Sequence, residues 1–297
     1  MIEESGGVVH WLVAQDGVRV RAAHWPEGAR GTVLLLNGRT EFIEKYAETV
    51  AALQARGFSV WTLDWRGQGR SARLHPDPVA HHVGRFEDYI ADAEGVLERI
   101  EGTVVLLAHS MGGHIGARLL ARHPGRFARA VLSAPMIDFL HGRVPRWATR
   151  VIAGVASLRG ANRFGPGPPR LPVLDRPFDG NPLTSCAERY AAGFALVRAD
   201  PALAIGGVTW GWLRAATASV AVLHRASTVR RIGLPVLVLT AGDERFVDNR
   251  AVVRFAARLA RAELVHFAGS RHELLGERDD IRDPVWAVID AFLAPVE

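Results

Sequence analysis

Three polar stretches of this 297-residue chain combine residue types that could perform nucleophilic catalysis. Ser110 lies in LLAHSMGG (106–113), His272 lies in GSRHE (269–273), and GDERFVD (242–248) holds three acids. A serine hydroxyl needs a base to take its proton, and an imidazole needs a carboxylate to fix its tautomer. The three stretches therefore predict a serine, histidine and acid constellation with Ser110 as the nucleophile.

The residues around Ser110 are typical of a strand that turns sharply into a helix. In such a nucleophile elbow the two backbones crowd each other, so the flanking positions must be small. Ala108 and Gly112 meet that requirement, although the usual G-x-S-x-G pattern has glycine at the first position. The simpler interpretation is a serine that only caps the helix.

Among the 12 histidines, His272 is the best candidate for the base, because it follows the last expected strand in a glycine-containing loop. His109 and His114 are closer to Ser110 in sequence and are expected to be structural. The acid remains open at this point among Asp243, Glu244 and Asp248, with Asp243 attractive because aspartate is the commoner third member.

The stretches that flank these residues predict an α/β fold with a mostly parallel sheet covered by helices on both faces. A hairpin (8–13 and 18–23) turns at Asp16-Gly17 and is expected at one edge. Nearly continuous apolar strands are expected at 32–37, 58–64, 103–109, 129–134, 235–241 and 262–267, and helices at 43–56, 86–100, 112–122, 249–260 and 284–292. Parallel strands end at one rim of a sheet, where ligands bind.

Residues 136–232 interrupt this alternation and are too long for a loop, so they predict an inserted helical cap on a core of residues 1–135 and 233–297. Its proline-rich part (164–182) is either a lid hinge or a rigid connector. Phe164, Trp210 and Trp212 wall an apolar acyl tunnel or simply form the interior of the cap.

With these motifs in place, the chain resembles the α/β-hydrolase superfamily, in particular its monoacylglycerol lipase and lysophospholipase L2-like branch. The resemblance rests on NGRTEFIEKY (37–46), DWRGQGRS (64–71), AHSMGG (108–113), GDERFVDN (242–249) and SRHELLGE (270–277), in the order serine, acid, histidine.

The family pattern G-x-x-D-r-x-x-D, laid on this chain without a gap, places Glu244 at the catalytic acid. The resemblance also implies an oxyanion hole made by the backbone N–H groups of Arg39 and Met111. Asn37 stands where the branch usually has histidine. DWRGQGRS is expected to be a structural turn in which Arg66 bridges loops.

The resemblance implies a serine ester hydrolase that cleaves a monoacylglycerol or lysophospholipid through an acyl-enzyme. A peptidase or amidase of the same superfamily would use the same residues. From a different class, the chain could be a catalytically silent binding protein.

Composition and charge indicate which compartment, partners and cofactors to expect for this chain. The single cysteine, Cys186, allows no internal disulfide and suits the cytoplasm, and neither a signal peptide nor a membrane span is expected. The net charge of +5 comes from scattered arginines, with Lys45 as the only lysine, so no nucleic acid is expected, while weak peripheral membrane contact is compatible with it. No phosphate-binding loop or metal-ligand spacing occurs, so we expect no cofactor and no metal; oligomeric state is left open.

Overall fold

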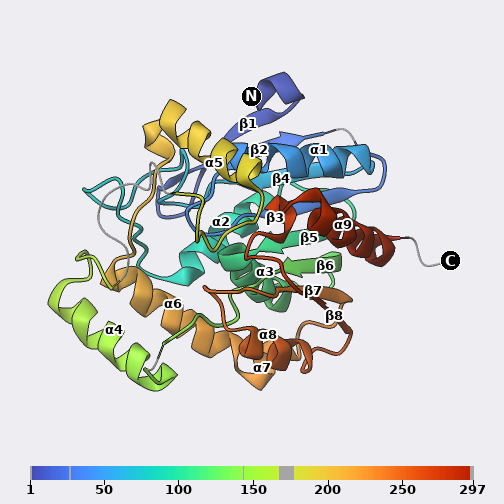
Figure 1. Cartoon of the computed structure of the whole chain (residues 1–297). Helices are drawn as coiled ribbons and strands as arrows, with labels where there is room; N and C mark the ends of the chain where they lie inside the picture. Colours follow the sequence, from blue (N-terminus) through green and yellow to red (C-terminus); the bar gives the residue numbers. More distant parts are fainter. Residues whose placement is uncertain (1, 27, 143, 167–176, 295–297) are drawn as a thin grey trace.

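The computed structural model describes residues 2–26, 28–142, 144–166 and 177–294. Its centre is an eight-stranded sheet in the order β1-β2-β4-β3-β5-β6-β7-β8 (Figure 1). Strand β2 pairs antiparallel with β1 and with β4, and all the other strand pairs are parallel. The strands are β1 (Val8–Val13), β2 (Arg19–Trp25), β3 (Thr32–Leu36), β4 (Ser59–Leu63), β5 (Val104–His109), β6 (Phe127–Ser133), β7 (Val236–Ala241) and β8 (Ala262–Phe267).

Helices alternate with the parallel strands and cover both faces of the sheet (Figure 1). They are α1 (Ala47–Ala55), α2 (Phe86–Leu97), α3 (Ser110–Arg122), α4 (Arg146–Gly160), α5 (Ala187–Ala199), α6 (Trp210–Leu223), α7 (Ala226–Val229), α8 (Asn249–Ala256) and α9 (Asp279–Leu293). Short 3-10 turns are η1 (Glu3–Ser5), η2 (Ile43–Tyr46), η3 (Pro201–Leu203) and η4 (Leu274–Gly276).

The continuous apolar runs of the strands are explained by a core on each side of the sheet. Leu34 and Leu36 of β3 belong to the core shared with α2, α3, α6 and α8, whereas Val33 and Leu35 belong to the core shared with α1 and α9. Successive side chains of a strand point to opposite faces, so a strand covered on both faces must be apolar throughout. This confirms the expected α/β class and the hairpin at one edge.

One helix boundary differs clearly from the sequence-based expectation. The C-terminal helix was expected over residues 284–292, where apolar residues recur at intervals of three and four. The structure starts α9 at Asp279 instead, so Pro284 lies inside the helix. Asp279 and Asp280 in the first turn favour this earlier start through the helix dipole. Ile281 and Arg282 both donate to the carbonyl of Arg278 there.

The segment between β6 and β7 contains α4 to α7 and, within its described part, no named strand. Helix α4 packs along α6 at the periphery of the molecule (Figure 1). Residues 167–176, which hold most of the proline-rich stretch, lie outside the described residues, so the choice between hinge and connector stays open. The division into core (1–135 and 233–297) and cap (136–232) stays a prediction.

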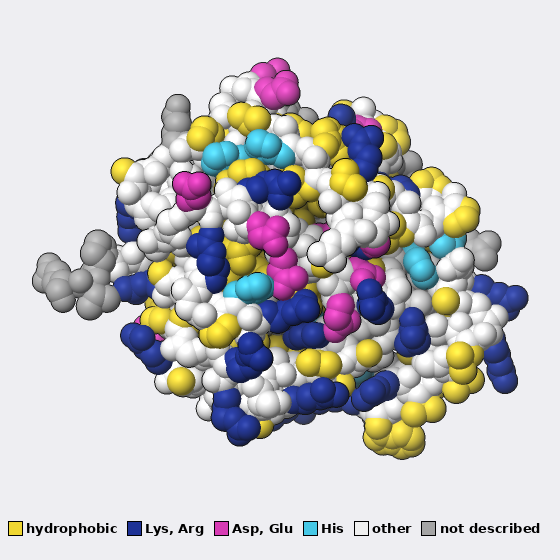
Figure 2. All heavy atoms as spheres, turned by 180° about the vertical axis from the view of Figure 1, so that it is seen from behind, with side chains coloured by type: hydrophobic (Ala, Val, Ile, Leu, Met, Phe, Trp, Pro, Cys, Tyr) yellow, Lys and Arg dark blue, Asp and Glu magenta, His cyan; other side chains and the backbone are white. Residues whose placement is uncertain are grey.

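The surface of the chain carries its charges in a mixed pattern. On the face shown in Figure 2, Lys and Arg side chains are spread widely, with Asp and Glu side chains among them near the centre. In the part of the chain that the structure describes, we find no helix with both the length and the apolarity needed to cross a bilayer.

Replacing the exposed Pro284 with alanine is expected to stabilise the protein by about 1 kcal/mol, because the new N–H can donate to the Asp280 carbonyl within α9. Urea unfolding measures this difference. Asp283→Ala, at the adjacent exposed position, serves as the control and should change stability by about 0.5 kcal/mol or less. A loss of stability in Pro284→Ala would place the helix start at Pro284, as the sequence suggested.

Candidate active site

Ser110 occupies a strained position at the junction of β5 and α3. Its φ of 52° lies in the left-handed region, which residues other than glycine rarely adopt. Two further described residues with this property, Thr40 (64°) and Ala134 (41°), follow β3 and β6. All three therefore lie beyond the carboxyl ends of neighbouring strands, where strained backbone often marks a functional site.

The small residues around Ser110 are required by close backbone contacts. A Cβ on Gly112 would lie 2.3 Å from the Leu36 carbonyl oxygen, a distance that no real side chain tolerates. Ala108 is accommodated because the facing position in α3 is Gly116, whose ideal Cβ would be 3.3 Å from that of Ala108. The alanine in place of the usual glycine is thus compatible with the elbow.

The structure brings Ser110, His272 and Glu244 into one hydrogen-bonded chain. His272 Nε2 lies 2.8 Å from Ser110 Oγ, and His272 Nδ1 lies 2.6 Å from Glu244 Oε2. A carboxylate can only accept, so Nδ1 carries the proton, and Nε2 is left to accept one from the serine hydroxyl. This is the geometry that activates a serine for attack on a carbonyl carbon.

Glu244 fits this position because both of its carboxylate oxygens accept hydrogen bonds. While Oε2 accepts from His272, Oε1 accepts from the backbone N–H groups of Phe246 (2.7 Å) and Val247 (3.2 Å). Burial alone would raise the pKa of Glu244, but the hydrogen bond and charge of His272 together with these two amides lower it below its ordinary value. The carboxylate therefore remains ionised at neutral pH.

The other two acids of this stretch have different partners. Asp243 is exposed and pairs with Arg245 at 3.1 Å. Asp248 caps α8 by accepting from the backbone N–H of Arg250 at 2.9 Å. Of the three candidates left open by residue type, only Glu244 lies against His272.

The two other histidines close to Ser110 in sequence are held by other groups. His114 is buried between the Met136 carbonyl (3.0 Å) and the Ser219 hydroxyl (2.7 Å). His109 lies 3.2 Å from the Ser133 carbonyl, and its ring packs 4.7 Å from that of His272. Burial lowers the pKa of His109 to about 4, so this ring is neutral at physiological pH.

The loop after β3 lies directly against Ser110. A Cβ on Gly38 would be 3.2 Å from the Cβ of Ser110, so the glycine leaves space beside this serine. Met111 is the second residue of α3, where a backbone N–H has no acceptor one turn earlier in the helix. Asn37 is buried and donates from Nδ2 to the Leu63 carbonyl at 2.7 Å.

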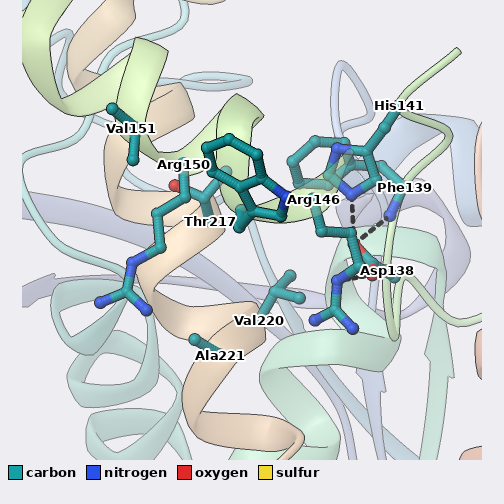
Figure 3. Close-up of a pocket in the computed structure, with 10 residues that line it drawn as sticks. Asp138, Phe139, His141, Arg146, Arg150, Val151, Thr217, Val220 and Ala221 are labelled. Atoms are coloured by element: carbon teal, nitrogen blue, oxygen red, sulfur yellow. Dashed lines mark hydrogen bonds and ion pairs between the residues drawn. The ribbon is translucent and has the colours of Figure 1, made fainter. Parts of the chain in front are cut away.

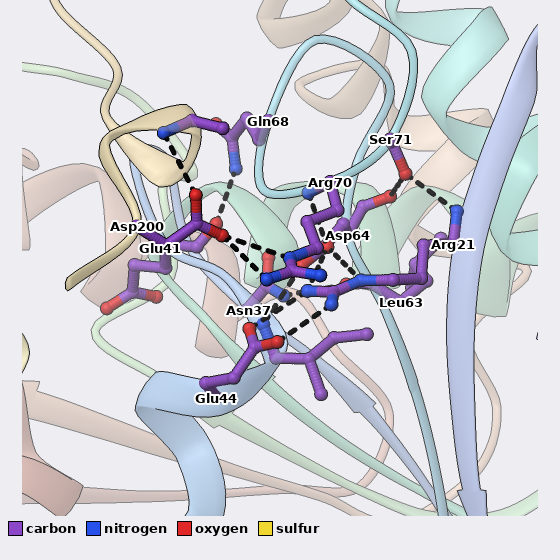
Figure 4. A network of polar contacts seen from close by, with 12 residues as sticks. Arg21, Asn37, Glu41, Glu44, Leu63, Asp64, Gln68, Arg70, Ser71 and Asp200 are labelled. Carbon is purple, nitrogen blue, oxygen red and sulfur yellow. Dashed lines mark hydrogen bonds and ion pairs between the residues drawn. The ribbon is translucent and has the colours of Figure 1, made fainter. Parts of the chain in front are cut away.

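Gln68 holds this loop and was missed by sequence reasoning. Its amide nitrogen donates to the carbonyls of Gly38 (3.1 Å) and Glu41 (3.2 Å), and its amide oxygen accepts from the Thr40 N–H (2.9 Å), as Figure 4 shows in part. The only available signal was its position between two glycines in DWRGQGRS, which favoured a turn without indicating what the turn contacts.

DWRGQGRS forms the structural turn that its glycines predict. Gly69 has a φ of 51°, and a Cβ there would lie 2.1 Å from the Asp64 carboxyl carbon. Arg66 bridges loops through Asp16 in the β1–β2 turn (2.5 Å) and Asp92 on α2 (2.6 Å). The turn therefore joins the hairpin to the helix layer next to the loop that Gln68 holds.

A cavity of about 710 Å³ lies between α4, α6 and residues 138–141 (Figure 3). Arg146 and Arg150 contribute guanidinium groups, and Arg146 pairs with the buried Asp138 at 2.6 Å. The remaining lining side chains are mostly apolar, notably Phe139, Trp147, Val151 and Val220. The cavity thus combines an apolar wall with positive charge.

The three aromatic residues expected to wall an acyl tunnel do not line the 710 Å³ cavity. Trp212 is buried in the main core, where its ring lies 5.5 Å from that of Phe86 and 5.4 Å from that of His81. Phe164 and Trp210 are half-buried and do not line the 710 Å³ cavity. Within the described ranges, we find no group of three His, Cys, Asp or Glu side chains placed to hold a metal ion.

A family model described as "Serine aminopeptidase, S33" matches residues 27–279. The chain belongs to this family. The match includes the elbow, the acid loop and His272, and it confirms the expected α/β-hydrolase relationship.

Two curated relatives place this family member in the expected branch. Lysophospholipase L2 of Escherichia coli K12 is 36% identical over 291 residues, which cover 93% of this chain and 83% of the relative. Monoacylglycerol lipase of Mycolicibacterium smegmatis is 29% identical over 280 residues, which cover 90% and 91%.

Among solved structures, a soluble variant of monoglyceride lipase from Saccharomyces cerevisiae is similar with a TM-score of 0.74. Its sequence is 21% identical, and the match covers 97% of this chain and 95% of that one. At this identity the similarity shows a shared fold.

Gly112→Ala is expected to destabilise the protein by about 2–3 kcal/mol, because the new Cβ would overlap the Leu36 carbonyl. Gly95→Ala is the matched control: it lies within α2 with nothing near its Cβ, and it should stabilise by about 0.5–1 kcal/mol. Chemical unfolding of both variants checks the pair. Equal effects would show that α3 does not approach β3 as closely as the structure has it.

Proposed function

We propose that this chain is a serine hydrolase that cleaves the carboxylic ester of a single-chain lipid, a monoacylglycerol or a lysophospholipid, through an acyl-enzyme. The observation that carries the proposal is the hydrogen-bonded chain from Ser110 Oγ through His272 to Glu244, with contacts of 2.8 and 2.6 Å. Its members come from three loops beyond the carboxyl ends of parallel strands, which is where α/β folds bind ligands.

In the proposed mechanism, Ser110 Oγ attacks the ester carbonyl carbon while His272 Nε2 accepts the hydroxyl proton. Glu244 orients His272 and stabilises the imidazolium. The backbone N–H groups of Arg39 and Met111 stabilise the negative oxygen of the tetrahedral intermediate. His272 then protonates the leaving alcohol, and the same base activates a water that hydrolyses the acyl-enzyme. None of these steps calls for a cofactor or a metal.

The relatives support a lipid ester as the substrate. Lysophospholipase L2 and monoacylglycerol lipase are both named for amphiphiles with a single acyl chain. The 710 Å³ cavity with the guanidinium groups of Arg146 and Arg150 is lined by residues other than Ser110, Glu244 and His272, so the choice of a lipid ester rests on the relatives. The family description "Serine aminopeptidase" makes amide hydrolysis the alternative to test.

Helix α4 supports a peripheral contact with a membrane that supplies this substrate. Leu158 is 90% exposed and Trp147 72% exposed, and three further apolar side chains of the helix are also exposed: Val151, Ile152 and Val155. Arg146, Arg150 and Arg159 lie on the same helix. Apolar side chains flanked by arginines are typical of helices that lie on a bilayer surface. Figure 2 shows hydrophobic side chains gathered at the lower right, where α4 lies.

The cellular location proposed for the protein is the cytoplasm. Cys186 is unpaired and buried, as expected for a protein that folds where thiols stay reduced. No nucleic acid is proposed as a partner.

Glu244→Gln is expected to lower kcat for ester hydrolysis by about 10³- to 10⁴-fold, because a neutral amide no longer fixes the His272 tautomer. Asp243→Asn is the matched control and should retain nearly full activity, since Asp243 is exposed and contacts Arg245. Steady-state kinetics on a p-nitrophenyl ester measures both, and fluorophosphonate labelling that disappears in Ser110→Ala identifies the nucleophile. A deep loss confined to Asp243→Asn, or labelling that persists in Ser110→Ala, would contradict these assignments.

Long-chain monoacylglycerols or lysophospholipids are expected to give a higher kcat/KM than short-chain p-nitrophenyl esters or aminoacyl amides.

Leu158→Glu should weaken turnover of substrate presented in anionic vesicles and leave turnover of a soluble ester unchanged. Val13→Glu, at another exposed apolar position (69%) on β1, provides the control. A higher kcat/KM on amides would favour the peptidase hypothesis. Equal effects of Leu158→Glu and Val13→Glu on vesicle turnover would show that α4 does not make the membrane contact.

A further inference from the structure

The only lysine of the chain lies beside the candidate active site, between the buried carboxylate of Glu41 and the half-buried carboxylate of Glu273. Lys45 Nζ is 2.8 Å from Glu41 Oε1 and 2.6 Å from Glu273 Oε1. The lysine side chain is 24% exposed, and the two carboxylates are 5% and 12% exposed. Glu41, four residues before Lys45, and Glu273, 228 residues after it, therefore share one ammonium.

Glu41 ties this ion cluster to the loop that carries the proposed oxyanion donor. Its second oxygen, Oε2, accepts from the backbone N–H of Gly38 and from the Tyr46 hydroxyl (2.6 Å). Burial alone would raise the pKa of Glu41, but Lys45, followed by His109, lowers it to about 2. An ionised carboxylate thus holds the residue next to Arg39 across the physiological pH range.

Glu273 ties the same cluster to the loop that carries His272. It directly follows His272 in the chain, and its backbone N–H donates to the Leu183 carbonyl at 2.8 Å. Strands β6 and β7 lie between β5 and β8, so the loop after β8 must extend across the rim for His272 to reach Ser110. An extended loop needs attachments on its far side, and Lys45 supplies one of them.

Stability alone does not account for three charges held together in this partly buried place. Desolvation of each ion offsets much of the attraction, so apolar replacements of buried ion pairs are often neutral or stabilising. A buried ion cluster does impose direction and distance on the backbones that carry it. At catalytic sites, misplacement by about 1 Å can cost about 100-fold in rate.

We propose that Lys45 is a positioning residue that locks the oxyanion loop to the histidine loop through Glu41 and Glu273. By this contact the amide of Arg39 and the imidazole of His272 face Ser110 in one geometry. The inference rests on the proposed function, because it assigns Lys45 a role in the same reaction.

The test is Lys45→Met, assayed with a soluble p-nitrophenyl ester that the wild type hydrolyses. We expect kcat to fall about 10- to 100-fold with KM changed about threefold or less, because only transition-state contacts are lost. The affinity for a trifluoromethyl ketone, which forms a tetrahedral adduct with the serine, should fall by a similar factor. Lys45→Arg keeps the positive charge in a partly exposed position and should restore most of kcat.

Arg56→Met is the matched control. Arg56 is 25% exposed and pairs with Asp290 at 2.6 Å, so the variant loses a similar ion pair on the surface. It should retain wild-type kcat. Thermal unfolding of every variant separates loss of fold from loss of positioning.

If Lys45→Met does not fold, Glu273→Gln carries the test, because its amide oxygen still accepts from Lys45. It should unfold like the wild type and lower kcat about threefold to tenfold. A wild-type kcat in folded Lys45→Met or Glu273→Gln, a change confined to KM, or a Lys45→Arg variant as impaired as Lys45→Met would each overturn the proposal. Wild-type protein that neither reacts with a fluorophosphonate nor turns over any ester would instead overturn the proposed function.

Discussion

The hydrogen bond between Ser110 and His272 joins positions 162 residues apart, and the arrangement of the site depends on it. It can form only if β5 and β8 end at the same rim of the sheet, which parallel pairing ensures. It also requires the loop after β8 to span two intervening strands. That loop is held from the other side by the Leu183 carbonyl and by Lys45. The position of His272 therefore depends on Lys45, which follows β3, and on Leu183, which lies in the segment between β6 and β7.

The strain at Ser110 is stabilised by the packing around it. The left-handed conformation at Ser110 costs on the order of 1–3 kcal/mol, and it persists because β5 and α3 are both anchored in the buried core. Gly112 then brings α3 against the carbonyl end of β3, which places the loop after β3 beside the serine. Rigid elements thus supply the geometry, while polar contacts from Gln68 and Glu41 set the loop that lies between them.

The segment between β6 and β7 joins this rigid centre to a more exposed surface. Residues 138–140 contact the acid loop, where the Leu140 N–H donates to the Phe246 carbonyl at 3.1 Å, and Phe246 packs 4.9 Å from His272. From there the chain enters α4, whose apolar side chains are turned outward. The side that receives the proposed lipid and the side that performs the proposed chemistry are therefore connected through a few backbone contacts.

The sequence by itself determined the α/β class, the order of the elements and the chemical types at the strand ends. Continuous apolar runs and glycine-bearing turns are local signals, so the strands lie within two residues of their expected bounds. Residue type left three acids open and the family pattern favoured Glu244, which the tertiary structure has against His272. The tertiary structure alone decided that Gln68 holds the loop after β3 and that the lone lysine lies between two carboxylates. Neighbouring residues such as Asp243 and Glu244 differ only in direction, and direction is set by contacts with distant segments. It also decided where α9 begins, because the apolar periodicity that predicted 284–292 does not mark the earlier turn that starts at Asp279.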